Sequence, residues 1–185
     1  MMKGSLPRLH KIFILWFTGL PCSGKTTLAL ALKKKIKSDY DISLAILDGD
    51  ILRQNLSKDL GYSTEDRRAH NLRTASHANQ IVQSGTPVCV SLISPCRNTR
   101  EEIKKTFSNV FEVYIKCSLT ECERRDNKGL YKKARMGNIK NFTGVDGPYD
   151  PPTHPDILVE TEKYGAEKSI SHILERLKDL KIIKG

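Results

Sequence analysis

A glycine-rich segment near the start of the chain has the residue types and spacing of a phosphate-binding loop. Residues 19–26 read GLPCSGKT, which fits the pattern G-x-x-x-x-G-K-[ST]. Glycine lets a backbone wrap closely round a phosphate, and a helix that begins at the lysine aims free N–H groups at the anion. In this pattern Lys25 reaches nucleotide phosphates and the Thr26 hydroxyl binds Mg²⁺.

The residues ahead of this loop admit a second interpretation. Basic residues (Lys3, Arg8 and Lys11), the apolar run 12–17, and small residues around Cys22 also describe a secretory signal peptide. Cleavage there would remove half of a strand–loop–helix unit that the following residues complete. We therefore expect the segment to bind phosphate and expect no signal peptide.

Two further apolar runs end in polar residues. Asp48-Gly49-Asp50 closes the run 42–50, with Arg53 one helical turn later, and ISPCRNTR (93–100) follows the next run. The carboxyl ends of parallel strands face the ligand crevice of an open sheet. Two carboxylates there can hold Mg²⁺ or accept a proton from an attacking hydroxyl. The plainer alternative is a turn that caps a helix.

The elements that must position these residues alternate between strands and helices. Buried strands are predicted from apolar runs at 12–19, 42–50, 86–94, 110–117 and 156–161. Helices are predicted from Lys25, over 63–85 with Ser63 as N-cap and Gly85 as the stop, over 98–107, over 118–126, and after the last strand to about Leu180. The alternation predicts an α/β fold with a five-stranded parallel sheet and helices on both faces.

Residues 126–155 interrupt this alternation. They combine four glycines and four prolines with basic and aromatic side chains. A long irregular segment inside a compact domain is usually functional. We expect a single domain over residues 1–185 in which the segment of about 126–155 is a mobile lid.

Composition narrows the possible partners. The chain has 185 residues and a net charge of +10, which suits anionic partners. The basic runs 33–37 and 175–184 fit solvated helix faces, and no arginine-rich tail or aromatic stripe indicates a nucleic-acid groove. The five cysteines form no C-x-x-C pair, so a zinc site has no support and a reducing cytoplasm is expected. We expect no nucleic-acid partner and no membrane partner.

Five segments, in this order, resemble the adenylylsulfate kinase family of P-loop kinases: DGDxxR (48–53), LGYSTEDR (60–67), ISPCRNTR (93–100), RRDNKGLYKKAR (124–135) and FTGVDGPYDPP (142–152). The resemblance runs from about Ile14 to Thr161. That family moves the γ-phosphate of ATP onto the 3′-hydroxyl of adenosine 5′-phosphosulfate. The resemblance implies the P-loop kinase fold, ATP and Mg²⁺ as cofactors, and a cytoplasmic homodimer that serves sulfate assimilation.

The resemblance also implies a role for each matching residue. ATP would be bound by Gly19, Cys22, Ser23, Gly24, Lys25, Thr26, Thr27 and Arg125, and the metal by Thr26 and Asp48. The catalytic residues would be Lys25, Asp50, Ser94 and Lys128, with Asp50 orienting or deprotonating the attacking hydroxyl. Ser94 is described in this family as a phosphorylated intermediate, whereas direct in-line transfer requires none.

The acceptor nucleotide would contact residues of all five segments, together with His70, which follows the second: Asp50, Arg53, Tyr62, Arg67, His70, Ile93, Ser94, Lys128, Gly129, Leu130 and Phe142. In this scheme Arg53 and Arg67 grip the phosphosulfate. Phe142 and Tyr62 stack on the two faces of the adenine.

The chain departs from the family pattern in three places. Pro21 and Cys22 replace serine and glycine, and Cys22 is strained if the loop requires a positive φ. Tyr62 stands in place of phenylalanine.

The third departure lies three residues after Arg67, where His70 stands in place of asparagine and Asn71 follows it. One residue is about 100° of helix rotation, so Asn71 is expected to point elsewhere. A protonated His70 would make acceptor affinity fall from pH 6 to 8. A kinase for another 5′-modified nucleotide, such as a cytidine diphosphate derivative, therefore stays an alternative, as does a nucleotide-dependent binding switch.

Overall fold

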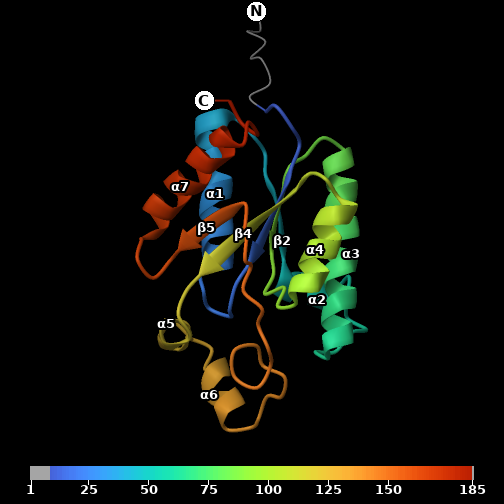
Figure 1. Ribbon diagram of the computed structural model, residues 1–185, viewed down its shortest axis with the longest axis vertical. Helices are drawn as coiled ribbons and strands as arrows, with labels where there is room; N and C mark the ends of the chain where they lie inside the picture. Colours follow the sequence, from blue (N-terminus) through green and yellow to red (C-terminus); the bar gives the residue numbers. More distant parts are fainter. Residues whose placement is uncertain (1–8, 185) are drawn as a thin grey trace, which may run out of the picture.

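One parallel sheet organises the protein, as a computed structural model that describes residues 9–184 shows (Figure 1). Its strand order is β2-β3-β1-β4-β5. The strands are β1 (Ile14–Thr18), β2 (Ala45–Asp48), β3 (Val88–Ser91), β4 (Val110–Lys116) and β5 (Ile157–Glu160). Lys3 and Arg8, the basic residues ahead of the apolar run, lie outside the described residues. The predicted α/β fold with a five-stranded parallel sheet is confirmed.

Helices cover both faces of the sheet (Figure 1). One face carries α1 (Lys25–Tyr40) and α7 (Ala166–Asp179), and the other carries α3 (Thr64–Gln83) and α4 (Arg97–Thr106). Three helices of six residues each, α2 (Gly49–Gln54), α5 (Leu119–Arg124) and α6 (Leu130–Arg135), lie at the carboxyl end of the strands. The sequence did not predict α2 and α6, because a helix of this length shows too little periodicity to recognise.

The central position of β1 in the sheet explains why apolar and polar side chains do not alternate in the first apolar run. Phe13, Leu15 and Phe17 pack in the cluster that includes α1 and α7. Ile14 and Trp16 pack in the opposite cluster with α3. Strands of parallel sheets are buried on both faces, so both sets of side chains must be apolar.

The ends of two elements place residues of the site. Ser63 caps α3 as predicted, since its Oγ accepts a hydrogen bond of 3.1 Å from the Asp66 N–H. The second strand ends earlier than predicted, at Asp48, because the Asp48 carboxylate accepts from the N–H of Asp50 at 3.0 Å and starts α2. Asp50 therefore stands on a helix and not on a strand.

Candidate active site

Two residues with left-handed backbone shape the phosphate loop between β1 and α1. Cys22 has φ 61° and Gly24 has φ 99°. The first bond of the helix runs from Leu28 N to Gly24 O, so the N–H groups of residues 25–27 have no partner within the helix. These groups and the helix dipole suit an anionic phosphate. The loop therefore does require a positive φ at Cys22, which is the condition under which strain was expected, and a side chain there costs about 1–2 kcal/mol.

Lys25 lies against the inside of this loop. Its side chain is only 8% exposed, and Nζ donates to the carbonyl oxygens of Gly19 at 3.0 Å and Leu20 at 2.7 Å. Burial lowers the pKa of the Lys25 ammonium to about 8, against the smaller opposing effect of Asp48 and Asp50. A bound phosphate would supply the counter-charge that this ammonium needs.

Oxygen atoms of three elements meet beside the loop. Thr26 Oγ1 on α1 donates to Asp48 Oδ2 at 2.7 Å and lies 3.2 Å from Ser91 Oγ. The sheet register pairs Asp48 with Ser91, which brings the ends of β2 and β3 together. Within residues 9–184 no group of three or more His, Cys, Asp or Glu side chains could hold a metal. One carboxylate and two hydroxyls still fit Mg²⁺, which prefers oxygen and is usually held by one or two carboxylates together with substrate phosphates.

Asp50 and Lys128 face each other across the opening of the site. Asp50 Oδ2 lies 3.4 Å from Lys128 Nζ, and both side chains are highly exposed. An exposed ion pair of this kind contributes little stability. Both groups can therefore exchange this contact for one to a substrate at small cost.

A cavity of about 630 Å³ lies between the phosphate loop, α2, α3 and the segment 126–155; we call it the acceptor cavity. It brings together most of the predicted substrate and catalytic residues: Lys25, Asp50, Arg53, Tyr62, Arg67, His70, Ile93, Ser94, Lys128, Leu130 and Phe142. The predicted metal residues Thr26 and Asp48 and the predicted ATP-binding residues Cys22 and Arg125 line it as well. Gly129 does not line it; this residue precedes α6 with φ 64°.

The guanidinium groups of Arg53 and Arg67 both lie near the exposed ring of Tyr62. Their guanidinium carbons lie 4.6 and 5.5 Å from the ring centroid. Arg53 also donates to the Gly61 carbonyl, and Arg67 donates to the carbonyls of Tyr62 at 3.1 Å and Asn141 at 2.7 Å. These bonds use only part of the five N–H donors of each guanidinium. Donors therefore remain for an oxyanion.

Phe142 is fixed by its own short loop. The N–H groups of Asn141 and Phe142 donate to the Asp146 carboxylate at 2.7 and 2.6 Å. The Phe142 ring packs edge-on against Tyr131, with centroids 4.9 Å apart. The Tyr131 hydroxyl donates at 3.0 Å to the carbonyl of Pro21. The segment 126–155 is thus tied directly to the phosphate loop.

A buried network holds Ser94 on the opposite wall. Ser94 has φ 48° and its Oγ accepts from Trp16 Nε1 at 2.9 Å. Arg100, which is 2% exposed, donates to the Ser94 carbonyl at 2.6 Å and pairs with Glu112 at 2.6 Å. Sequence reasoning missed Trp16, Arg100 and Glu112, since nothing local marks their partners.

The pH behaviour expected of His70 does not hold. The side chain is 4% exposed, and Nδ1 lies 2.9 Å from Ser57 Oγ. Burial, followed by the positive charges of Arg53, Arg73 and Arg67, lowers the pKa of His70 from 6.5 to about 4. The imidazole is therefore neutral between pH 6 and 8, so loss of a His70 charge cannot weaken acceptor binding there.

The expectation that Asn71 would point away from the site is wrong. Asn71 and His70 both line the acceptor cavity, and Asn71 is 3% exposed. They stand three and four residues after Arg67. Positions i, i+3 and i+4 share one helix face, so a rotation of about 100° is not enough to remove Asn71 from it.

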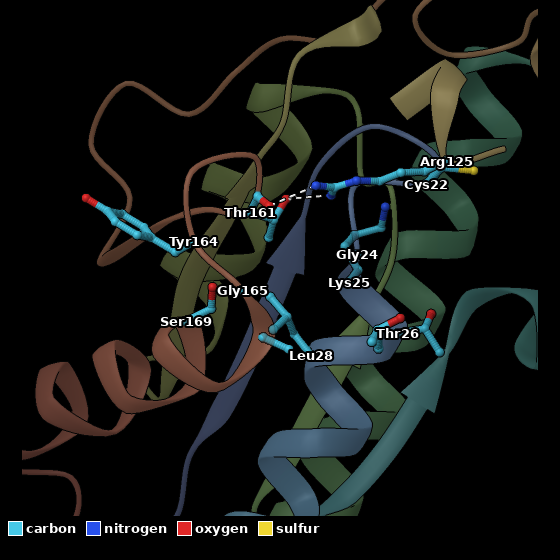
Figure 2. A pocket seen from close by; sticks show the side chains of 12 residues that line it. Cys22, Gly24, Lys25, Thr26, Leu28, Arg125, Thr161, Tyr164, Gly165 and Ser169 are labelled. Atoms are coloured by element: carbon cyan, nitrogen blue, oxygen red, sulfur yellow. Dashed lines mark hydrogen bonds between the residues drawn. The ribbon is translucent and has the colours of Figure 1, made fainter. Parts of the chain in front are cut away.

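A second cavity, of about 480 Å³, lies on the other side of the phosphate loop; we call it the donor cavity. Figure 2 shows Arg125 reaching across it to Thr161. Arg125 donates to the Thr161 carbonyl at 2.9 Å and to its hydroxyl at 3.2 Å. The Thr161 hydroxyl in turn donates at 2.8 Å to the carbonyl of Ser23.

Most of the predicted ATP-binding residues line the donor cavity: Cys22, Gly24, Lys25, Thr26, Thr27 and Arg125. Gly19 and Ser23 line neither cavity. Ser23 is fully buried, and a side chain at Gly19 would collide with the Ile115 carbonyl. Their role is to shape the loop from within.

Sequence reasoning missed the residues that follow β5 on the wall of the donor cavity: Thr161, Tyr164, Gly165, Ala166 and Ser169. A signal for them was present. Thr161 follows a parallel strand, and the rule that placed Asp48 at the ligand edge of the sheet applies equally there.

Comparisons with known proteins agree with this geometry. The family model for adenylylsulphate kinase matches residues 11–160. The adenylyl-sulfate kinase of Oceanobacillus iheyensis is 44% identical over 176 residues, which cover 94% of this chain and 88% of that protein. The probable adenylyl-sulfate kinase of Synechocystis is 45% identical over 171 residues, with coverages of 92% and 96%.

A solved structure gives the same result. The APS kinase CysC of Mycobacterium tuberculosis, in complex with AMPPNP and APS, superposes with a TM-score of 0.86 at 37% identity. The superposition covers 91% of this chain and 98% of that chain. No helix within residues 9–184 is long and apolar enough to cross a membrane. The family model matches the phosphate loop and all lining residues of the two cavities up to the end of β5. The chain therefore belongs to the adenylylsulfate kinase family.

Proposed function

We propose that the protein transfers the γ-phosphate of ATP to the 3′-hydroxyl of adenosine 5′-phosphosulfate. The observation that carries this proposal is the pair of cavities on either side of one phosphate loop. Lys25 and Thr26 line both of them. A phosphoryl group held on the loop is therefore accessible to a donor on one side and an acceptor on the other.

The donor cavity suits ATP. The phosphates would lie on the N–H groups of residues 25–27, and the nucleoside would lie toward Arg125 and Tyr164, which line this cavity. Thr26 and Asp48 would hold Mg²⁺, which neutralises phosphate charge when it is bound. The mycobacterial relative was solved with an ATP analogue, which supports a nucleotide triphosphate as donor.

The acceptor cavity suits a nucleotide with an anionic 5′ group. Arg53 and Arg67 provide the positive charge, and Phe142 and Tyr62 provide aromatic surfaces for a base. Stacking tolerates any base, so these rings alone do not select adenine. The mycobacterial relative was solved with APS, which favours adenosine 5′-phosphosulfate over other 5′-modified nucleotides.

Transfer then depends on position and charge. Asp50 lies at the mouth of the acceptor cavity, where its carboxylate can orient the 3′-hydroxyl and take its proton. Lys25 and Lys128 neutralise charge on the transferred group. Ser94 Oγ already accepts from Trp16, which favours a role for Ser94 in shaping the wall and favours direct in-line transfer.

We also propose that the segment 126–155 closes over both substrates as a lid of this single domain. Closure would exclude water and suppress ATP hydrolysis. The weak Asp50–Lys128 pair is one contact that opening would break. Hydrogen exchange in this segment should slow when ADP and acceptor are added together, and uniform protection of the free protein would contradict a lid.

Two further expectations from the sequence concern assembly and location. A homodimer is expected, and light scattering of the purified protein would test it. A reducing cytoplasm is expected, and the five cysteines are all free thiols in the structure.

The experiment that tests the proposed function is a screen of acceptors. The purified protein is incubated with Mg²⁺, ATP and one of a panel of 5′-modified adenosine and cytidine nucleotides, and the products are mapped by mass spectrometry. A 3′-phosphorylated product from adenosine 5′-phosphosulfate is expected. If only another nucleotide is phosphorylated, that nucleotide replaces adenosine 5′-phosphosulfate as the proposed acceptor. ATP hydrolysis without any acceptor would indicate a nucleotide-dependent binding switch.

A further inference from the structure

Ser57 is a fully buried serine that the proposed reaction does not use. It lies in the turn after α2, where its N–H donates to Leu52 O at 3.0 Å and its carbonyl accepts from Leu60 N at 3.1 Å. Arg73 on α3 clamps the same turn through two bonds to the Asp59 carboxylate, of 2.6 and 2.8 Å. The backbone of Ser57 is therefore fixed, and its hydroxyl points to one partner, Nδ1 of His70, at 2.9 Å.

His70 has one ring nitrogen satisfied and one not. Nδ1 faces Ser57, while Nε2 is buried and has no hydrogen-bond partner among the described residues. The side chain is 96% buried in the wall of the acceptor cavity, as its exposed fraction of 4% shows. A buried polar atom without a partner is costly, so a bound molecule is the natural source of that partner.

The ring carries a single proton, because burial and the neighbouring arginines keep the imidazole neutral. The proton sits on Nδ1 or on Nε2, and Ser57 decides between them. Ser57 Oγ makes no other hydrogen bond within the described part of the chain. If Nδ1–H donated to Ser57, the buried hydroxyl hydrogen would have no acceptor. If Ser57 donates to Nδ1, the buried hydroxyl hydrogen is used and the ring proton lies on Nε2, in the wall of the acceptor cavity, where a bound molecule can supply its acceptor.

We propose that Ser57 is a positioning residue for the acceptor: its hydroxyl holds His70 in the Nε2–H tautomer, so that this N–H donates to an oxyanion of the acceptor beside Arg53 and Arg67. The inference rests on the proposed function, since it requires an acceptor with an anionic 5′ group. Arg53 and Arg67 are among the charges that act on His70, which places the imidazole in the same cationic region. A neutral donor there adds a directional contact without adding a third charge.

The tautomer is tested without any turnover. Long-range ¹H–¹⁵N correlation of labelled protein at pH 7.5 should show a protonated Nε2 and an unprotonated Nδ1 for His70. The Ser57→Ala variant should shift the ring toward a mixture of both tautomers. A protonated Nδ1 in the wild-type protein would overturn the inference while leaving the proposed function untouched.

The acceptor contact is tested by a double-mutant cycle. Ser57→Ala should raise the KM for adenosine 5′-phosphosulfate about fivefold to tenfold, the effect of losing one hydrogen bond, with the KM for ATP unchanged. An asparagine carries its N–H without help from Ser57, so Ser57→Ala should have little further effect in a His70→Asn background. An equal loss in both backgrounds would mean that Ser57 is merely structural and would overturn the inference.

Ser84→Ala is the matched control, because it removes a hydroxyl at the far end of α3 that bonds only the Ile81 carbonyl. Its KM values should equal those of the wild-type protein. A protein that phosphorylates no nucleotide at all would instead overturn the proposed function, and the NMR result would then stand by itself as a property of the fold.

Discussion

The hydroxyl of Thr26 and the carboxylate of Asp48 lie 2.7 Å apart, although 22 positions separate them in the chain. Thr26 stands in the first turn of α1, and Asp48 is the last residue of β2. The parallel register of β2 with β3 and of β3 with β1 brings the two together. The same relationship places the two oxygen groups that would hold Mg²⁺ beside the phosphate loop.

Asp48→Asn should raise the Mg²⁺ concentration needed for half-maximal activity roughly tenfold or more, because a charged ligand becomes neutral. Asparagine is as good an N-cap as aspartate, so α2 and the stability of the protein should be preserved. Activity titrated against Mg²⁺ measures the effect. Asp179→Asn, at the end of α7, is the control, and an unchanged requirement in Asp48→Asn would exclude Asp48 as a ligand.

ATP affinity should fall as the pH rises through about 8, the lowered pKa of Lys25. The ammonium is charged below this pH and loses its proton above it, so between pH 7 and 9 the affinity should drop about tenfold. Calorimetry at both pH values, in buffers of different ionisation enthalpy, should also detect proton uptake on binding near pH 8. Constant affinity from pH 7 to 9 would contradict the lowered pKa of Lys25.

Lys25→Ala should abolish phosphorylation while the fold stays intact.

Cys22→Gly should stabilise the protein by about 1 kcal/mol, since glycine adopts a left-handed conformation without strain. Cys22→Ala keeps the Cβ atom and should give no such gain. Urea unfolding of the three proteins measures the difference. A less stable glycine variant would show that contacts of the Cys22 side chain, such as that with Asp126, outweigh the backbone strain.

Glu112→Gln should destabilise the protein by about 3–5 kcal/mol, because it leaves the buried Arg100 charge without a counter-charge. Since Arg100 also bonds the Ser94 carbonyl, the KM for the acceptor should rise more than that for ATP. Glu102 lies on the same helix as Arg100 and forms an exposed ion pair with Arg68 of α3. Glu102→Gln breaks this pair and should cost less than about 1 kcal/mol. Similar losses for the two variants would be incompatible with a buried ion pair.

Stability should decrease as the pH falls from about 6.5 to about 4, in part because of His70. The folded protein holds this imidazole neutral, whereas the unfolded chain takes up a proton below its ordinary pKa, so acid favours unfolding in this window. The His70→Asn variant should show a shallower loss between pH 6.5 and 4 in denaturant titrations. Parallel curves for both proteins would mean that His70 titrates normally in the folded state.

The sequence by itself determined the phosphate loop, the five strands and the order of the strands and longer helices. These features are local. The loop depends on glycine conformations and on a helix N-terminus, and the strands depend on runs of apolar residues that lie next to one another in the chain. The same local rules placed Ser63 as the cap of α3.

Only the tertiary structure decided how the walls of the two cavities are held. Trp16 and Ser94 are 78 positions apart, and Ser57 and His70 belong to different elements. Arg67 and Arg73 stand three residues on either side of His70, but nothing in the chain indicates that the imidazole is buried and that Arg53 lies beside it, which together keep it neutral. Desolvation and hydrogen-bond satisfaction depend on which groups the fold brings together in space, and no spacing along the chain encodes that.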